Sequence, residues 1–125
     1  MRQNSPLRHQ LIFRVNRAVK VVEARFGLTD LDFTARAVLN IIAEAEAECW
    51  PLHVSDVVRL QDFATPPTVH NHLAKLKKAG WIRYEQDPDD GRARLVLLTP
   101  FARSAFELMS DEVNRILKSL PRGGV

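Results

Sequence analysis

The sequence lacks most of the residues that build disulfide scaffolds and membrane spans. Cys49 is its single cysteine, so no disulfide can form within the chain, and we expect a reducing, cytoplasmic location. No run of about 18 apolar residues occurs, which predicts that the chain has no membrane partner. The first 25 residues have no apolar block with a cleavage site, so no signal peptide is expected.

Motifs for catalysis and metal binding are missing as well. The sequence has no phosphate-binding loop, no zinc signature and no Ser/His/Asp spacing typical of a hydrolase. His70 and His72 are two residues apart, whereas a helical metal pair needs a spacing of three or four. We therefore predict that the protein is not an enzyme and takes no cofactor and no metal.

The composition is that of one globular domain spanning residues 1–125, with 46% hydrophobic and 26% charged residues. A net charge of +3 permits nucleic-acid binding without establishing it. The distribution of charge is more informative, because no acidic residue lies between Thr65 and Tyr84 and four basic residues do. A helix in this stretch would suit a polyanion.

The pattern from Thr65 to Gly80 predicts such a helix. Thr65 is a suitable N-cap and Pro66 a suitable first residue. Val69, Leu73 and Leu76 recur at spacings of four and three, which places them on one apolar face. The opposite face carries mainly hydrogen-bonding and cationic residues: Pro67, Thr68, Asn71, Lys75 and Lys78.

A β-hairpin is predicted to follow this helix. The segments 81–84 and 95–98 are rich in branched and aromatic residues, and the turn formers of 87–92 separate them. An upstream helix from Ser55 to about Asp62 would complete a helix-turn-helix over 55–80, with the wing over 81–98. Longer helices are predicted over 5–26, 30–49 (capped by Thr29) and 100–120, with an extended link at 50–54. The fold class is thus mainly α with a small β-wing: a winged helix-turn-helix domain flanked by long N- and C-terminal helices.

Three segments in this region resemble the MarR (multiple antibiotic resistance regulator) family of transcriptional regulators. They are 76–82, 87–92 and 96–100, and the spacing Asp-x-Arg-x-x-x-Val-x-Leu-Thr is met by Asp90, Arg92, Val96, Leu98 and Thr99. The resemblance covers about residues 7–120. Tyr84 and Ala102 stand where relatives often have arginine and glycine.

The resemblance implies a homodimer that binds double-stranded DNA at a pseudo-palindromic operator and regulates transcription, usually as a repressor. Relatives are often repressors that small phenolic or lipophilic ligands, or oxidation, release from DNA. A small-molecule effector is therefore a candidate partner. Their dimers are built from the N- and C-terminal helices. Relatives usually have a further C-terminal helix, so we expect the dimer here to use 7–26 and 101–120.

The same resemblance implies DNA contacts from the helix at Thr65, Pro67, Thr68 and Asn71. Asn71 is the best candidate base reader, because asparagine can bond N6 and N7 of adenine together. Lys75 and Lys78 suit phosphates, and His70 flanks this face, whereas His72 is closer to the apolar face and is expected to be partly packed.

In the wing, Arg92 is the candidate probe of the minor groove. The resemblance gives Asp90 the role of holding Arg92 through an ion pair, and Arg94 is a candidate for a backbone contact.

Two other functions remain open at this point. One is a DNA-binding accessory protein without an effector response. The other is a winged-helix module for protein–protein interaction, which would tolerate the loss of Lys75, Lys78 and Arg92. Cys49 is expected to be a small, partly buried hydrophobe rather than a redox sensor, because no cationic residue adjoins it in sequence.

Overall fold

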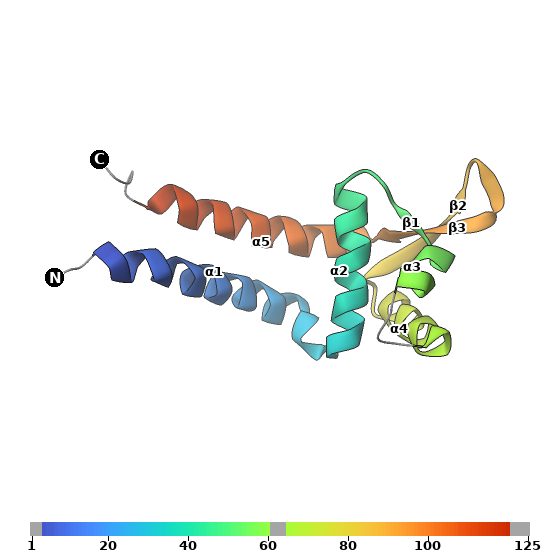
Figure 1. Cartoon of the computed structure of the whole chain (residues 1–125), viewed down its shortest axis with the longest axis horizontal. Helices are drawn as coiled ribbons and strands as arrows, with labels where there is room; N and C mark the ends of the chain where they lie inside the picture. Colours follow the sequence, from blue (N-terminus) through green and yellow to red (C-terminus); the bar gives the residue numbers. More distant parts are fainter. Residues whose placement is uncertain (1–3, 61–64, 121–125) are drawn as a thin grey trace. The chain divides into compact units, whose positions relative to one another are not determined.

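The computed structural model describes residues 4–60 and 65–120, except for the side chains of 4–9 and 60 (Figure 1). Most of these residues are helical, and three strands form a small antiparallel sheet, which confirms the predicted fold class. The elements are α1 (Asn4–Phe26), a 3-10 turn (Leu28–Asp30), α2 (Phe33–Ala47), β1 (Leu52–His53), α3 (Val54–Leu60), α4 (Pro66–Lys78), β2 (Ile82–Asp87), β3 (Asp90–Leu98) and α5 (Pro100–Ser119). The predicted end of the first helix-turn-helix helix at Asp62 lies outside the described residues.

The chain forms two compact units. The sheet-containing unit is residues 30–103, and the two-helix unit combines the residues before 30 with those after 103. Each unit is described separately below.

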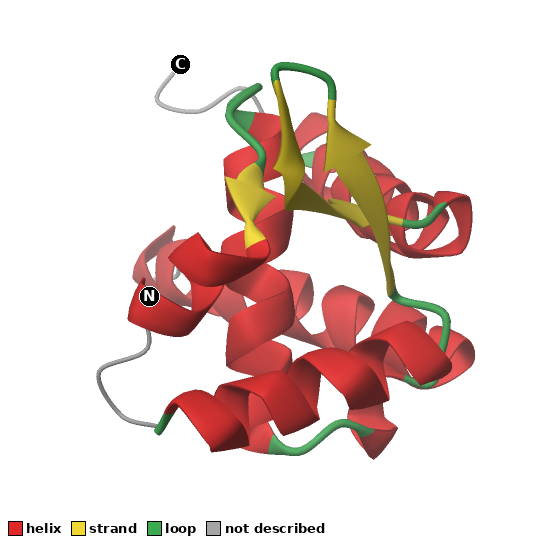
Figure 2. Cartoon of the chain, turned by 90° about the vertical axis from the view of Figure 1, so that its right-hand side faces the viewer, coloured by secondary structure: helices red, strands yellow, loops and turns green. Residues whose placement is uncertain are grey.

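The sheet has the strand order β1–β3–β2 (Figure 2). Leu52 pairs with Val96, and Ile82 pairs with Leu98, so β1 covers only the base of the β2–β3 hairpin. The hairpin is longer than predicted. Its strands reach Asp87 and Asp90, so the predicted turn over 87–92 is reduced to two residues, and the polar tips of both strands continue the pairing.

Helix α2 differs from the prediction at both ends. Asp32, not Thr29, is the N-cap, and its carboxylate accepts a 2.8 Å hydrogen bond from the backbone N–H of Ala35. That bond lowers the pKa of the Asp32 carboxyl. At the other end Cys49 has a φ of 61°, which stops the helix at Ala47. Cys49 is exposed, so the prediction that it is partly buried was wrong.

The core of the sheet-containing unit contains the apolar face predicted for α4, together with apolar side chains of α2. Val69, Leu73 and Leu76 of α4 are at most 1% exposed, as are Val38 and Ile42 of α2. Burying one such side chain contributes roughly 1.5–3 kcal/mol. Because α2 packs against both α4 and β3, the apolar face of α4 is fixed and its opposite face is left for solvent.

Helix α4 ends as predicted at Gly80, whose φ of 87° belongs to a left-handed C-terminal cap. The N–H of Trp81 bonds to the carbonyl of Leu76, and that of Gly80 to Lys77, as in a Schellman motif. Thr99 then joins this corner to α5. Its hydroxyl donates to the carbonyl of Gly80 at 2.5 Å and accepts from the N–H of Ala102 at 3.1 Å.

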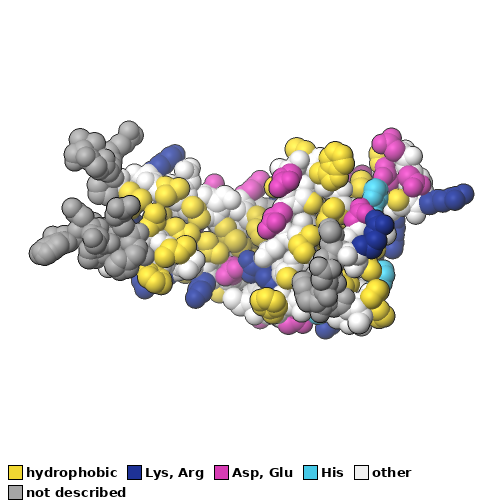
Figure 3. Space-filling view, in the orientation of Figure 1, with side chains coloured by type: hydrophobic (Ala, Val, Ile, Leu, Met, Phe, Trp, Pro, Cys, Tyr) yellow, Lys and Arg dark blue, Asp and Glu magenta, His cyan; other side chains and the backbone are white. Residues whose placement is uncertain are grey.

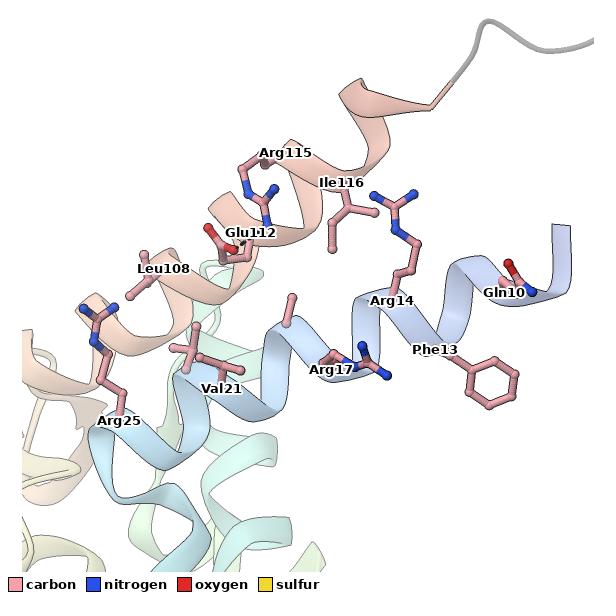
Figure 4. A pocket seen from close by; sticks show the side chains of 12 residues that line it. Gln10, Phe13, Arg14, Arg17, Val21, Arg25, Leu108, Glu112, Arg115 and Ile116 are labelled. Carbon is pink, nitrogen blue, oxygen red and sulfur yellow. Dashed lines mark hydrogen bonds and ion pairs between the residues drawn. The ribbon is translucent and has the colours of Figure 1, made fainter. Parts of the chain in front are cut away.

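In the two-helix unit, α1 and the main part of α5 lie side by side (Figures 1 and 4). Val22, Met109 and Ile116 are buried, and Arg14 donates to the hydroxyl of Ser119 at 3.2 Å. Other large apolar side chains of this unit stay exposed, namely Ile12, Phe13, Val21 and Leu117, and hydrophobic atoms gather over both helices (Figure 3). Among the described helices, none combines the length and the apolar character that crossing a bilayer requires.

Candidate nucleic-acid interface

The outer face of α4 presents the residues that the sequence predicted for DNA contact. These side chains are all exposed: Thr65, Pro67, Thr68, His70, Asn71, Lys75 and Lys78. Thr65 occupies the N-cap position, but its hydroxyl makes no bond to the helix backbone, contrary to its predicted capping role. It lies 2.9 Å from the hydroxyl of Thr68 instead. The two threonines therefore form one exposed polar pair at the N-terminal end of the helix.

His72 is part of the inner face of α4. The residue is 8% exposed, and its Nδ1 has no hydrogen-bond partner among the described residues. The nearest carboxylate oxygen, Oδ1 of Asp32, is 3.8 Å from Nδ1, which is too far for a hydrogen bond. His72 is thus a packing residue, as expected, and not one that faces a ligand.

The register of the hairpin explains how Arg92 is presented. Gln86 pairs with Arg94, and Asp87 pairs with Asp90, so residues 91–93 have no Cα partner on β2. Such a bulge bends one strand and redirects its side chains. Nε2 of Gln86 donates to the carbonyl of Gly91 at 2.8 Å, and a Cβ at Gly91 would lie only 3.1 Å from that nitrogen. Arg92 is exposed at the centre of this bulge.

Asp90 holds Arg92 differently from the prediction. Its Oδ1 accepts a 3.1 Å bond from the backbone N–H of Arg92. No ion pair between the two side chains occurs in the described part of the chain, so the guanidinium of Arg92 is not tied to this carboxylate. The backbone of the bulge is fixed while the charged end of Arg92 stays available.

Tyr84 connects the helix to the wing. Nζ of Lys77 lies 5.0 Å from the centroid of its ring, and the guanidinium carbon of Arg94 lies 4.6 Å from it, both within cation–π range. Burial raises the pKa of the Tyr84 hydroxyl. The guanidinium of Arg94 is thus stacked on the ring of Tyr84. This contact constrains the position of Arg94 within the wing but does not neutralise its charge.

A polar cluster lies at the other side of the hairpin, around His53. Its Nε2 is 2.6 Å from Oδ2 of Asp87, and its Nδ1 is 3.2 Å from Oδ2 of Asp56. Asp56 also accepts a hydrogen bond from the backbone N–H of His53 and one from Arg59 at 2.6 Å. The cluster therefore joins β1, α3 and the turn of the wing. Helix α3 begins at Val54, directly after His53 and one residue before the predicted start at Ser55.

Between α3, α4 and β3 there is a cavity of about 420 Å³ with a strongly basic lining. His53, Arg59, His70, Arg92 and Arg94 all line it. Figure 3 shows basic and acidic side chains together over the wing, so a polyanion would meet arginines beside carboxylates there. Asp87 and Asp90 already accept hydrogen bonds within the protein, and Arg59 is paired with Asp56. Among the arginines that line this cavity, Arg92 and Arg94 have no carboxylate partner in the described residues.

A second cavity, of about 590 Å³, lies within the two-helix unit (Figure 4). Its walls combine apolar side chains, including Phe13 and Ile116, with four arginines: Arg14, Arg17, Arg25 and Arg115. Arg115 is paired with Glu112 at 2.9 Å, and this bond lowers the pKa of the Glu112 carboxyl. Within the described residues, no group of three metal-ligating side chains occurs in either unit.

Sequence reasoning brought together the α4 face and Arg92, but it missed His53, Asp87, Tyr84 and Gln86. One local signal was available. Asp56 lies three residues after His53, the spacing at which an acidic side chain caps a helix N-terminus. The pairing of His53 with Asp87 spans 34 residues and has no local signature.

Comparison with known proteins agrees with this architecture. A model of the MarR family matches residues 26–93. The structure of S. aureus MepR bound to ethidium bromide is similar over 97% of this chain and 85% of its own, with a TM-score of 0.66 and 22% sequence identity. A probable transcriptional regulator from Pseudomonas aeruginosa is 28% identical, over 89% of this chain and 83% of its own, with a TM-score of 0.55. The S. aureus MepR–DNA complex matches 90% of this chain and 86% of its own, at 18% identity and a TM-score of 0.61. No curated protein matches the sequence.

Proposed function

The chain belongs to the MarR family, and on this basis we propose that it is a homodimeric, sequence-specific regulator that binds double-stranded DNA and represses transcription. A family of transcription regulators also accords with the prediction that the chain is not an enzyme. The protein would act in the cytoplasm, where bacterial relatives meet DNA.

The observation that carries the proposal is the pairing of two exposed elements in one unit. The outer face of α4 offers Asn71 and Thr68 for bases and Lys75 and Lys78 for phosphates. The bulge of β3 offers Arg92 with a free guanidinium, which suits the negative potential of a narrow minor groove. One MarR-fold relative, S. aureus MepR, is described in complex with DNA, which supports the same class of ligand here.

A homodimer would supply a second set of these contacts. The exposed Ile12, Phe13, Val21 and Leu117 provide an apolar surface on α1 and α5, the helices that the resemblance assigns to the dimer. Two copies related by a two-fold axis would read a pseudo-palindrome with half-sites about one helical turn apart. A small-molecule effector remains part of the proposal, and the 590 Å³ cavity of the two-helix unit is the larger candidate site for it.

The test is a fluorescence anisotropy titration at several salt concentrations. One duplex carries the region upstream of the protein's own gene, and the other a scrambled sequence. We expect tighter binding to the upstream duplex, with a salt dependence that becomes shallower by about 0.9 in log–log slope for each phosphate contact removed, as in Lys75→Ala. Asn71→Ala should lose about 1–3 kcal/mol of discrimination between the duplexes. Arg92→Ala should weaken binding, while Lys118→Ala, a loss of charge on α5, is the matched control.

The alternatives give different results. Equal binding to both duplexes would point to an accessory DNA-binding protein. No binding at low salt, or full binding by Lys75→Ala, Lys78→Ala and Arg92→Ala, would contradict the regulator and direct the search to protein partners.

A further inference from the structure

His53 is the one side chain that contacts both the wing turn and the start of α3 in the described structure. Its ring is about one third exposed, so solvent protons reach it, and both ring nitrogens face carboxylates. In a neutral imidazole only one nitrogen carries a hydrogen, and the other presents a lone pair. The observed geometry, with Asp87 at 2.6 Å and Asp56 at 3.2 Å, is therefore satisfied in full only by the imidazolium.

Asp87 links His53 to the turn of the wing. It is the last residue of β2 before the turn, and its other oxygen, Oδ1, accepts a 2.8 Å bond from the N–H of Asp89. Asp90 in turn holds the N–H of Arg92. Hydrogen bonds at Asp87 and Asp90, joined by the peptide bond between Asp89 and Asp90, thus link His53 to the bulge that presents Arg92.

Asp56 ties the other side of the ring to α3. It holds the backbone N–H of His53 at 3.1 Å, the imidazole, and the guanidinium of Arg59. Because this carboxylate of the first turn of α3 accepts from two groups of His53 and from Arg59, it is a firm anchor for the ring. On the wing side, no other side chain from outside the hairpin is hydrogen-bonded to residues 87–93 in the described structure.

The charges around His53 come from every element packed on it. Asp56 and Arg59 face it from α3, and Asp87 faces it from β2. Arg92 and Arg94 of β3, with His70 of α4, line the cavity that it shares. The cations oppose protonation at longer range, whereas the two carboxylates are within hydrogen-bond distance, and a DNA phosphate entering this cavity would offset the cations.

We propose that His53 is a positioning residue for DNA binding: its imidazolium ties the wing to α3, holds the Arg92 bulge in place, and makes DNA affinity fall as pH rises above neutrality. This inference rests on the proposed function, because it assigns Arg92 a place on the duplex.

The direction of the pH effect follows from the pKa values. The hydrogen bond to Asp87 raises the pKa of His53 above 6.5, and Asp56 acts in the same direction. The contribution of the His53 cluster to the position of the wing, and hence to DNA affinity, is therefore complete below pH 6.5. It is lost as pH rises through the folded pKa of His53. The pKa of Asp87 is lowered from 3.8 by the same bond, so the carboxylate stays charged throughout this range.

The experiment compares His53→Gln, Asp87→Asn and His72→Leu with the wild type in anisotropy titrations between about pH 5.5 and 8.5, the range in which histidine titrates. We expect wild-type affinity to fall about tenfold across this range, the change that one pKa unit of coupling produces. His53→Gln and Asp87→Asn should bind weakly and with a flatter profile. His72→Leu removes a histidine that faces the core and not the DNA, so it should keep the wild-type fall.

A double-mutant cycle separates positioning from general damage. If His53 acts through Arg92, adding His53→Gln to Arg92→Ala should cause no further loss of affinity. In parallel, NMR follows the backbone amides of Asp90 and Arg92 in the free protein, and both should titrate with His53 in the wild type but not in His53→Gln.

The outcomes distinguish the two proposals. If the wild type binds DNA with a profile that His53→Gln does not change, the role of His53 is wrong and the regulator stands. If His53→Gln and Arg92→Ala are additive, the route through Arg92 is wrong. If the wild type does not bind DNA, the regulator is wrong, and so is the DNA role of His53. The wing amides still decide in that case whether His53 holds the wing, because amides that do not titrate would overturn that contact too.

Discussion

The two units of the chain differ in how completely they bury their apolar side chains. In the sheet-containing unit, the apolar faces of α2 and α4 are almost completely buried, and side chains such as Thr99 and Glu46 bond the ends of its elements. In the two-helix unit, Phe13 and Val21 remain 64% and 62% exposed. The first unit thus has a closed core, with Phe33 and Trp50 exposed beside the two ends of α2, whereas the second leaves apolar side chains exposed along its helices.

Each unit contains a Glu–Arg ion pair, and the two pairs differ in what they connect. Glu46 of α2 accepts from the backbone N–H of Leu98 at 2.8 Å and from Nε of Arg103 at 2.9 Å, with only 18% of its side chain exposed. Glu112 of α5 bonds only Arg115 among the described residues, one turn away on the same helix and beside the cavity of the two-helix unit. A Glu–Arg pair thus joins α2 to α5 in the sheet-containing unit, whereas in the two-helix unit it links two residues of the same helix.

The largest contrast is expected from leucine truncation. Leu73→Ala removes a side chain that is 1% exposed and should lower the free energy of unfolding by about 2–5 kcal/mol. Leu117→Ala removes one that is 50% exposed and should instead weaken self-association. Urea denaturation at several protein concentrations measures both effects, and equal losses of stability at low concentration would remove the distinction between the units.

The ion pairs give the next largest effect. Glu46→Ala leaves the N–H of Leu98 without its acceptor and should cost about 1–3 kcal/mol. Glu112→Ala should leave the unfolding midpoint unchanged, because its exposed partner is readily solvated. The comparison is made by thermal unfolding at low and high salt, and a larger effect at Glu112 would contradict this account.

A gain of stability is expected at His72. Replacing it with leucine removes a buried Nδ1 that has no partner in the described structure, which should stabilise the unit by about 1 kcal/mol. Chemical denaturation measures the gain, and DNA affinity should not change because the side chain faces the core. A destabilised His72→Leu would indicate that this nitrogen has a bonded partner such as a buried water.

The smallest effect concerns the end of α2. Helices α1 and α4 are followed by glycines with positive φ, Gly27 and Gly80, but Cys49 occupies the corresponding position after α2. Cys49→Gly should relieve the contact of Cβ with its own backbone, by up to about 1 kcal/mol. Cys49→Val, which is β-branched, is the opposing variant and should lower the melting temperature.

The sequence predicted what depends on neighbouring residues. The apolar spacing of α4, its glycine stop and the two wing strands follow local rules, and all are present. The start of α2 was missed because both Thr29 and Asp32 are good caps, and only the packing of the whole unit selects between them. The bulge at Arg92 and the His53–Asp87 contact depend on strand register and on residues far apart in sequence, which periodicity does not encode.

Helix α5 runs without interruption from Pro100, in the sheet-containing unit, to Ser119, in the two-helix unit. Each residue of an α-helix advances the chain by about 1.5 Å and turns it by about 100°. Inserting or deleting one residue near Ser104 would leave both units intact but rotate every later side chain of α5 about the helix axis. The number of residues in this helix therefore determines the direction in which its later side chains point around the helix axis. If the last part of α5 joins two copies, the length of the helix thus decides which of its side chains are available to that contact.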